Sequence, residues 1–206
     1  MSEVTQNMSE EQIPECDKLL AVKVMLKGIG EDIEREGLLE TPLRVVRMWN
    51  EIFRGYDEYQ KPKITIFNNG ADGIKVDQMI CDSGDFYSHC EHHMVPFFGK
   101  YWFAYIPNPK GKVLGLSKVA RIVDFHSAKL QVQERLVHDI VVDLYDALGK
   151  PKPLAMGLVM EAEHLCKSMR GVKKKGKMRT TKLIGTFKTD PSARAEFLDW
   201  VNKNGN

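Results

Sequence analysis

The sequence predicts an α+β fold in which helices pack on an antiparallel sheet, and three observations lead to this prediction. Residues 17–53 show helical periodicity, and from about residue 63 the period changes to that of strands. A clear amphipathic helix over residues 131–148 is then followed by a strictly alternating segment over 154–166. No internal repeat or linker interrupts the 206 residues, so we predict a single domain over residues 16–206.

The N-terminal segment predicts a tail followed by a helix. Residues 1–15 are polar and acidic, and we expect them to be disordered. Apolar residues recur at helical spacing over residues 17–36, and Gly37 suits the C-terminal end of that helix.

A second helix is predicted from Thr41 to Phe53. Thr41 can cap it, and Pro42 follows at the first helical position. Arg44 and Arg47 are three positions apart and therefore share one face of this helix.

The middle of the chain predicts strands. Segments rich in β-branched and aromatic residues predict strands at 63–67, 74–80 and 97–107. Ser117 can cap a short helix that runs to about Asp124.

The last part of the chain places chemistry-bearing side chains on a strand. Because residues 154–166 alternate, His164 and Cys166 are predicted to lie on the face that also carries the apolar residues of that strand. The remaining predicted elements are a strand at 179–187 and a helix at 190–201.

Composition narrows the class of protein. Apolar residues make up 43% of the chain and charged residues 28%, as in ordinary globular domains. The N-terminus lacks the basic and apolar regions of a signal peptide, and no apolar run approaches membrane-spanning length. We therefore expect a cytoplasmic protein with no membrane partner, whose four cysteines are free thiols or metal ligands.

Positive charge is concentrated in one segment. The net charge is only +2, but residues 167–182 contain eight basic residues and no acidic one. This segment is either a solvated loop or an anion site. We expect no nucleic-acid partner, because the run lacks interleaved aromatic residues and the rest of the chain is not basic.

Two clusters of soft ligands predict a metal site. Cys90 and His93 have the spacing of a local zinc chelate, and His164 and Cys166 form a second pair two positions apart. Two cysteines and one histidine make three ligands with an open position, which is typical of catalytic zinc. Spacing does not decide which histidine binds the metal, and Glu91 is expected to support one of the histidines.

Other residues are candidates for binding an anionic or purine ligand. Ser117, Lys118 and Arg121 lie at a predicted helix start, where backbone N–H groups also favour anions. Arg170 begins the basic segment. Taken alone, each of these charges is more often a solvated side chain. Glu134 suits the first turn of a helix, but a carboxylate is also the natural acceptor for the paired N–H groups of guanine.

Several segments, taken in order, closely resemble the GTP cyclohydrolase I family. They are CEHHMVPFFG, YIP, GLSKVARIV, QVQERL and EHLCKSMRG, with TPLRVVRMW before them and GTF and EFL after them. The resemblance covers about residues 17–200. It implies a zinc enzyme that converts GTP and water into 7,8-dihydroneopterin triphosphate and formate. It also implies the tunnelling fold, assembled into a toroidal homodecamer with active sites between subunits.

The resemblance also implies a role for each site residue. The zinc ligands would be Cys90, His93 and Cys166. The catalytic residues would be His92, His164, Ser117 and Gln133. The substrate ligands would be Glu134 for guanine and Lys118, Arg121 and Arg170 for the ribose triphosphate, with Arg44 and Arg47 reaching it from a neighbouring subunit. His89 departs from the family pattern and adds an imidazole that could compete for the metal.

Two other function classes fit the sequence less well. A zinc nucleoside deaminase would carry a Cys-x-x-Cys motif, which this chain lacks. A non-catalytic nucleotide-binding relative with structural zinc would be expected to lack His92 or His164, and both are present.

Overall fold

The computed structural model describes residues 13–205, which cluster into two compact units, one ending at Ile52 and the other beginning at Phe53. Most of the predicted disordered tail, residues 1–12, lies outside the described residues, and Glu15 already begins a helix. The single domain over residues 16–206 stays a prediction.

The first unit is helical. Its elements are α1 (Glu15–Gly28), a 3-10 turn (Glu36–Leu38) and α2 (Thr41–Ile52). The predicted extension of the first helix to residue 36 is wrong. Gly30 adopts a φ of 87°, and its N–H donates to the carbonyl of Lys27, which closes the helix earlier than Gly37 would. On α2, the predicted face carries exposed Arg44 and Arg47, and Arg44 pairs with Glu40 at 2.6 Å.

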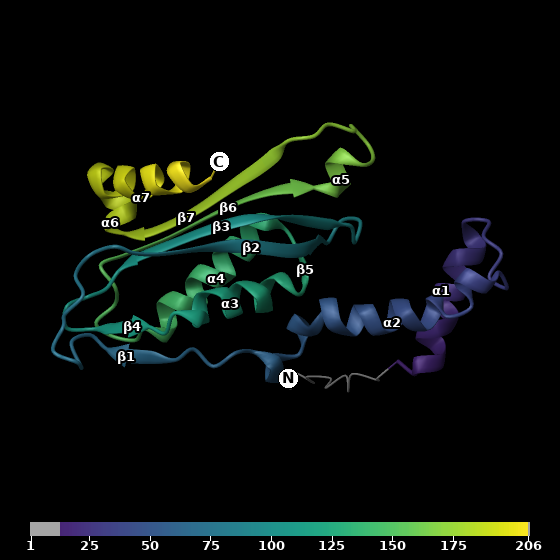
Figure 1. Cartoon of the computed structure of the whole chain (residues 1–206), viewed down its shortest axis with the longest axis horizontal. Helices are drawn as coiled ribbons and strands as arrows, with labels where there is room; N and C mark the ends of the chain where they lie inside the picture. Colours follow the sequence, from purple (N-terminus) through teal and green to yellow (C-terminus); the bar gives the residue numbers. More distant parts are fainter. Residues whose placement is uncertain (1–12, 206) are drawn as a thin grey trace, which may run out of the picture. The chain divides into compact units, whose positions relative to one another are not determined.

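The second unit is built on a sheet. Its strand order is β5-β2-β3-β6-β7, in which β2, β3, β6 and β7 are antiparallel neighbours and β5 pairs parallel to the end of β2 (Figure 1). The strands are β2 (Ile80–Cys90), β3 (Pro96–Ile106), β5 (Leu130–Gln131), β6 (Ala155–His164) and β7 (Lys177–Gly185). A separate pair joins β1 (Ile66–Asn68) to β4 (Lys112–Leu114). The predicted antiparallel sheet with packed helices is confirmed.

One predicted strand is wrong. Residues 74–79 form a loop, and the strand runs from Ile80 to Cys90 instead. The Asn69 side chain binds both the N–H and the carbonyl of Val76, at 2.8 and 2.7 Å, and so takes the groups that a strand partner would need. Because β2 has a polar sequence, the hydrophobic pattern did not predict this strand. Its pairing with β3 makes it one.

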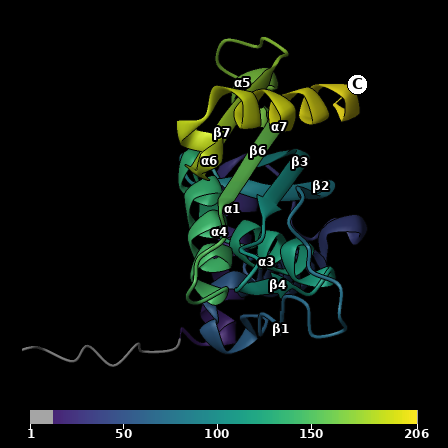
Figure 2. The ribbon, with the colours of Figure 1, turned by 90° about the vertical axis from the view of Figure 1, so that its left-hand side faces the viewer.

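Helices cover both faces of the sheet, as the two views show (Figures 1 and 2). On one face lie α3 (Ser117–Ser127) and α4 (Gln133–Ala147), and on the other lie the short α6 (Thr186–Thr189) and α7 (Pro191–Asn204). Strand β6 therefore buries both of its faces, with Leu158 in the core under α3 and α4 and Val159 in the core under α7. The strand ends at His164, so Cys166 lies in α5 (Leu165–Ser168) rather than on the strand face as predicted.

The two ends of the strand order carry open hydrogen-bonding edges. Among the described residues, β2 has an outer partner only at His89 and Cys90, and β7 is paired only with β6. Within this part of the chain, no helix combines the length and apolar content needed to traverse a bilayer.

Candidate active site

The sheet brings the two predicted ligand clusters together at one end. Cys90 is the last residue of β2, His164 is the last residue of β6, and Cys166 follows in α5. Strand β3 lies between them and pairs Phe97 with His164. The potential ligand atoms of Cys90, His164 and Cys166 all lie within 4.8 Å of one another. Two segments separated by more than 70 residues therefore form one group.

The turn after Cys90 presents the remaining imidazoles. It is closed by hydrogen bonds from Cys90 N to Val95 O at 2.9 Å and from Met94 N to Cys90 O at 2.8 Å, and Met94 adopts a φ of 57°. His92 Nδ1 lies 3.4 Å from the Sγ of Cys90, and His92 is exposed. The turn thus holds one predicted catalytic histidine directly beside the thiol.

His93 faces a different partner. Its Nε2 lies 2.7 Å from a guanidinium nitrogen of Arg170. Because guanidinium only donates, His93 accepts this bond through a ring nitrogen that has a lone pair. His164, rather than His93, is therefore the imidazole grouped with the two thiols here. The assignment of His93 as the third ligand stays a prediction.

His164 is held from two sides. Its ring stacks on Phe97 with centroids 4.5 Å apart, and its Nε2 lies 2.8 Å from Oε1 of buried Gln133. The Nε2 of Gln133 donates to oxygen acceptors on Met160 and Thr180, at 2.9 and 2.7 Å, so Oε1 must face the imidazole. His164 therefore donates from Nε2, and its Nδ1 keeps the lone pair in the neutral ring.

Burial shapes the titration of this group. It lowers the pKa of His164, against an opposing effect of the Glu134 carboxylate. Burial also raises the pKa of the Cys166 thiol, and the neighbouring Cys90 adds to that rise. Two thiols this close ionise together only when a cation compensates their charge. The donor set of two sulfurs and an imidazole fits zinc, which prefers thiolate and imidazole ligands.

A cavity of about 530 Å³ opens beside the group. Its lining includes the predicted catalytic residues His92, Gln133 and His164 and the predicted guanine ligand Glu134, which is exposed. Lys167 and Lys177 also line it. The cavity therefore offers an imidazole pair, a carboxylate and cations next to a potential metal site.

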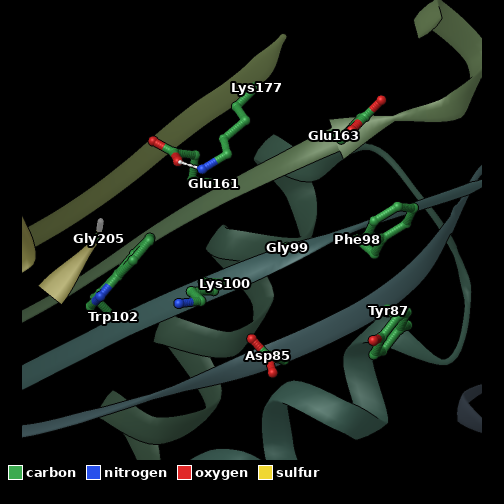
Figure 3. Close-up of a pocket in the computed structure, with 10 residues that line it drawn as sticks. All are labelled: Asp85, Tyr87, Phe98, Gly99, Lys100, Trp102, Glu161, Glu163, Lys177 and Gly205. Carbon is green, nitrogen blue, oxygen red and sulfur yellow. Dashed lines mark ion pairs between the residues drawn. The ribbon is translucent and has the colours of Figure 1, made fainter. Parts of the chain in front are cut away.

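A second hollow, of about 360 Å³, lies on the face that carries α7 (Figure 3). Tyr87, Phe98 and Trp102 supply aromatic walls, and Lys177 points to Glu161 with an ion pair of 3.0 Å. Its described lining residues include no cysteine or histidine, so it is not the candidate site.

One predicted group lies far from the cavity. Ser117, Lys118 and Arg121 are in the first turns of α3, where Leu116 and Val119 share a hollow with Ile80 at the start of β2. Cys90 is at the other end of that strand, and 11 residues of strand span roughly 33–37 Å. One chain therefore does not bring these three residues to its own metal group. Arg44 and Arg47 belong to the first unit.

Other residues of the site were not foreseen from the sequence. Phe97 and Arg135 both lie within motifs of the resemblance, but their contacts depend on the fold. The carboxylate of Glu91 binds Arg135, not the histidine that we expected. His89 alternates away from Cys90 and lies edge-on to Phe53 at 5.2 Å, so it does not compete for the metal group in this structure.

The fold and the site together define a class: an α+β protein whose antiparallel sheet ends in a thiol–imidazole group that can hold a metal ion beside an open cavity. A sequence profile of the GTP cyclohydrolase I family matches residues 20–202, and the chain belongs to that family. The GTP cyclohydrolase 1 of Caldanaerobacter subterraneus subsp. tengcongensis is 48% identical over 88% of this chain and 94% of that protein. The one from Thermoanaerobacter pseudethanolicus is 46% identical, with the same coverage.

The solved structures that match include one described as the apo form of the archaeosine synthase QueF-Like, with 13% identity and a TM-score of 0.38, covering 50% of this chain and 92% of that one. A score this low supports no conclusion about fold or function.

Proposed function

We propose that this protein is a hydrolase that converts GTP and water into 7,8-dihydroneopterin triphosphate and formate. The observation that supports it best is the group of Cys90, His164 and Cys166 beside the cavity lined by Glu134, in a chain 48% identical to a GTP cyclohydrolase 1. Opening the guanine imidazole ring and releasing formate each consume a water, and closing the pterin ring returns one. We place the enzyme in the cytoplasm.

Zinc is the proposed metal. The thiolates of Cys90 and Cys166 would hold it, with His93 as the third ligand that the family resemblance implies. His164, which lies beside the two thiols, would stay unligated and move protons. When bound, zinc supplies a Lewis acid next to the cavity. The donor chemistry fits this ion, as argued above.

The imidazoles move protons in this proposal. Gln133 keeps the proton on Nε2 of His164, which leaves Nδ1 to accept a proton and then pass it to the ring nitrogen of guanine as the C8–N bond breaks. The lowered pKa of His164 favours its neutral form at neutral pH, so it is ready to act first as a base. His92 is the proposed helper in the later rearrangement, together with Ser117.

Guanine recognition is assigned to Glu134. Its carboxylate has two oxygens that can accept from N1–H and from the 2-amino group of guanine. Gln133, the preceding residue on α4, is buried and already engaged with His164, so it would set the position of the proton-transfer group rather than the substrate.

The positions of the residues proposed to bind the triphosphate support an active site that is shared between two copies of the chain. Arg170 lies beside His93, but Ser117, Lys118 and Arg121 lie a strand length away in the same chain. We propose that these three residues serve the cavity of a neighbouring copy, in a toroidal homodecamer to which Arg44 and Arg47 also contribute. The open edges of β2 and β7 support this, because pairing them between copies would satisfy both edges and close a ring.

The direct test is to incubate the zinc-loaded protein with GTP and to measure formate and the fluorescence of oxidised neopterin. Formate should appear with GTP and not with ATP. Absence of formate from a folded, zinc-loaded protein would overturn the proposed activity.

The shared site has its own test. A Ser117→Ala/Lys118→Ala/Arg121→Ala variant and a Cys166→Ala variant should each be inactive, and co-expression of the two should restore part of the activity in mixed oligomers. Mixed oligomers that stay inactive, or a monomer by light scattering with full activity, would contradict sharing between copies.

A further inference from the structure

Glu91 is bound through its main chain to β5, just before α4, and through its side chain to the first turn of α4. It follows Cys90 in the turn that carries His92 and His93. Its N–H donates to the carbonyl of Gln131 at 3.1 Å, and its carboxylate accepts a hydrogen bond from Nη2 of Arg135. The turn is thus attached to the segment of residues 130–135, which follows α3.

Arg135 is itself held in place before it meets Glu91. Its Nε donates to Oε1 of Gln131 at 2.9 Å, and its Nη2 also donates to the carbonyl of Leu130 at 3.2 Å. Gln131 is buried, and its amide donates to the carbonyl of His126 at 3.1 Å. A planar guanidinium fixed in this way presents its charge in one direction, so the carboxylate meets a preset partner.

Three consecutive residues in the first turn of α4 therefore face three different parts of the site. Gln133 binds His164, Glu134 lines the cavity, and Arg135 binds Glu91. The turn contributes His92 to the lining of the cavity, and the start of α4 contributes Gln133 and Glu134, while other lining residues come from segments 164–167 and 176–178. The Glu91–Arg135 pair is a side-chain link between the turn and the start of α4.

We propose that Glu91 and Arg135 are positioning residues whose ion pair sets the turn after Cys90 against α4, and so sets the geometry of the metal group. The proposal rests on the function proposed for this cavity. The side chains of Arg135 and Glu91 are 45% and 37% exposed, and ion pairs of that exposure add little to global stability. Loss of partners that orient ligands, in contrast, typically weakens metal binding or activity by about 10- to 100-fold.

The test compares Glu91→Gln, Arg135→Met and the double variant with wild type. The matched control is Asp146→Asn, which removes the carboxylate of an exposed pair with Lys152 at the far end of the same helix. Three quantities are measured: zinc affinity by competition with a chromogenic chelator, the rate of Cys90 alkylation in metal-free protein by peptide mass spectrometry, and the melting temperature.

We expect each single variant to bind zinc about 10- to 100-fold more weakly and to alkylate faster at the buried Cys90, with a melting temperature close to that of the control. The double variant should resemble either single variant, because one link is broken in all three. The proposal is overturned if Glu91→Gln behaves like Asp146→Asn, or if the two single effects add in the double variant. The alkylation rates test the positioning role of Glu91 and Arg135 without any measurement of activity. If wild type released no formate from GTP, only the proposed activity would be refuted.

Discussion

Oε1 of Gln133 lies 2.8 Å from Nε2 of His164, and the surroundings of the Gln133 amide leave that oxygen as the acceptor. The hydrogen bond reaches from the first turn of α4 to the last residue of β6. The family resemblance predicts that Gln133 is a catalytic residue, and in the structure its side chain contacts His164.

Replacing Gln133 by Met should lower kcat for GTP by roughly 100-fold and change KM much less, because displacing a reacting group by about 1 Å has an effect of that size. The matched control is Thr180→Val, which removes one acceptor of the amide but keeps the bond to His164. The measurement is steady-state kinetics with GTP on both variants. Equal kcat values for Gln133→Met and Thr180→Val would show that His164 does not depend on its hydrogen bond to Gln133.

Metal analysis should find about one zinc per chain, from a set of three protein ligands. Cys166→Ala should lose both zinc and turnover. Of His93→Ala and His164→Ala, the variant that loses zinc identifies the third ligand, and the one that keeps zinc but loses kcat identifies the proton-transfer group. Full activity in zinc-free protein would refute the metal assignment.

Glu134→Ala should lose GTP turnover while keeping its zinc and its oligomeric size. Wild type should not act on ATP, because adenine lacks the paired donors, and sites built to bind such donors reject the wrong ligand by on the order of 10⁴. If Glu134 were only a first-turn helix carboxylate, the variant would lose roughly 0.3–1 kcal/mol of stability and keep near-normal kinetics.

Arg121→Ala and Arg170→Ala should weaken GTP binding far more than guanosine binding. Losing a charge-assisted contact costs roughly 1.5–3 kcal/mol, or about 10- to 150-fold in affinity. Titration calorimetry with both ligands separates the outcomes, and equal losses for the two would mean that these arginines act on structure rather than on phosphate.

Asp143 should make stability depend on acid pH. Burial raises the pKa of Asp143, but hydrogen bonds from His126 and Lys61, each at 2.7 Å, more than offset it and hold the pKa below its usual 3.8. A carboxyl with a depressed folded pKa stabilises the fold above pH 3.8, and this contribution is lost as the pH falls through the folded pKa.

Asp143→Asn should therefore lose roughly 1.5–3 kcal/mol at pH 7 and show a shallower loss of stability between pH 4 and pH 2, both measured by urea unfolding. Asp139→Asn on the same helix is the control and should follow wild type. If Asp143→Asn lost stability between pH 4 and pH 2 as steeply as wild type, other groups would be responsible for the acid dependence.

Local patterns determined much of this protein. Helical periodicity placed α2, α3, α4 and α7, because this signal acts within a few residues of the chain. The predicted cap at Ser117 is wrong, since Ser117 is the first residue of α3 and no side chain caps that helix. The residue types at Cys90, His164 and Cys166 predicted soft metal ligands, since ligand chemistry belongs to the side chain and does not depend on the fold. Motif order was also enough to identify the family.

Tertiary structure decided what depends on distant partners. Strand β2 has a polar sequence and is a strand because β3 pairs with it. Cys90 at the end of β2 comes close to Cys166, which follows the end of β6, because only β3 lies between these two strands in the sheet. The tautomer of His164, the link from Glu91 to Arg135 and the distance of Ser117 from the cavity all follow from contacts between segments far apart in the chain. Side-chain hydrogen bonds act over about 3 Å, so only the folded arrangement of those segments determines which ones form.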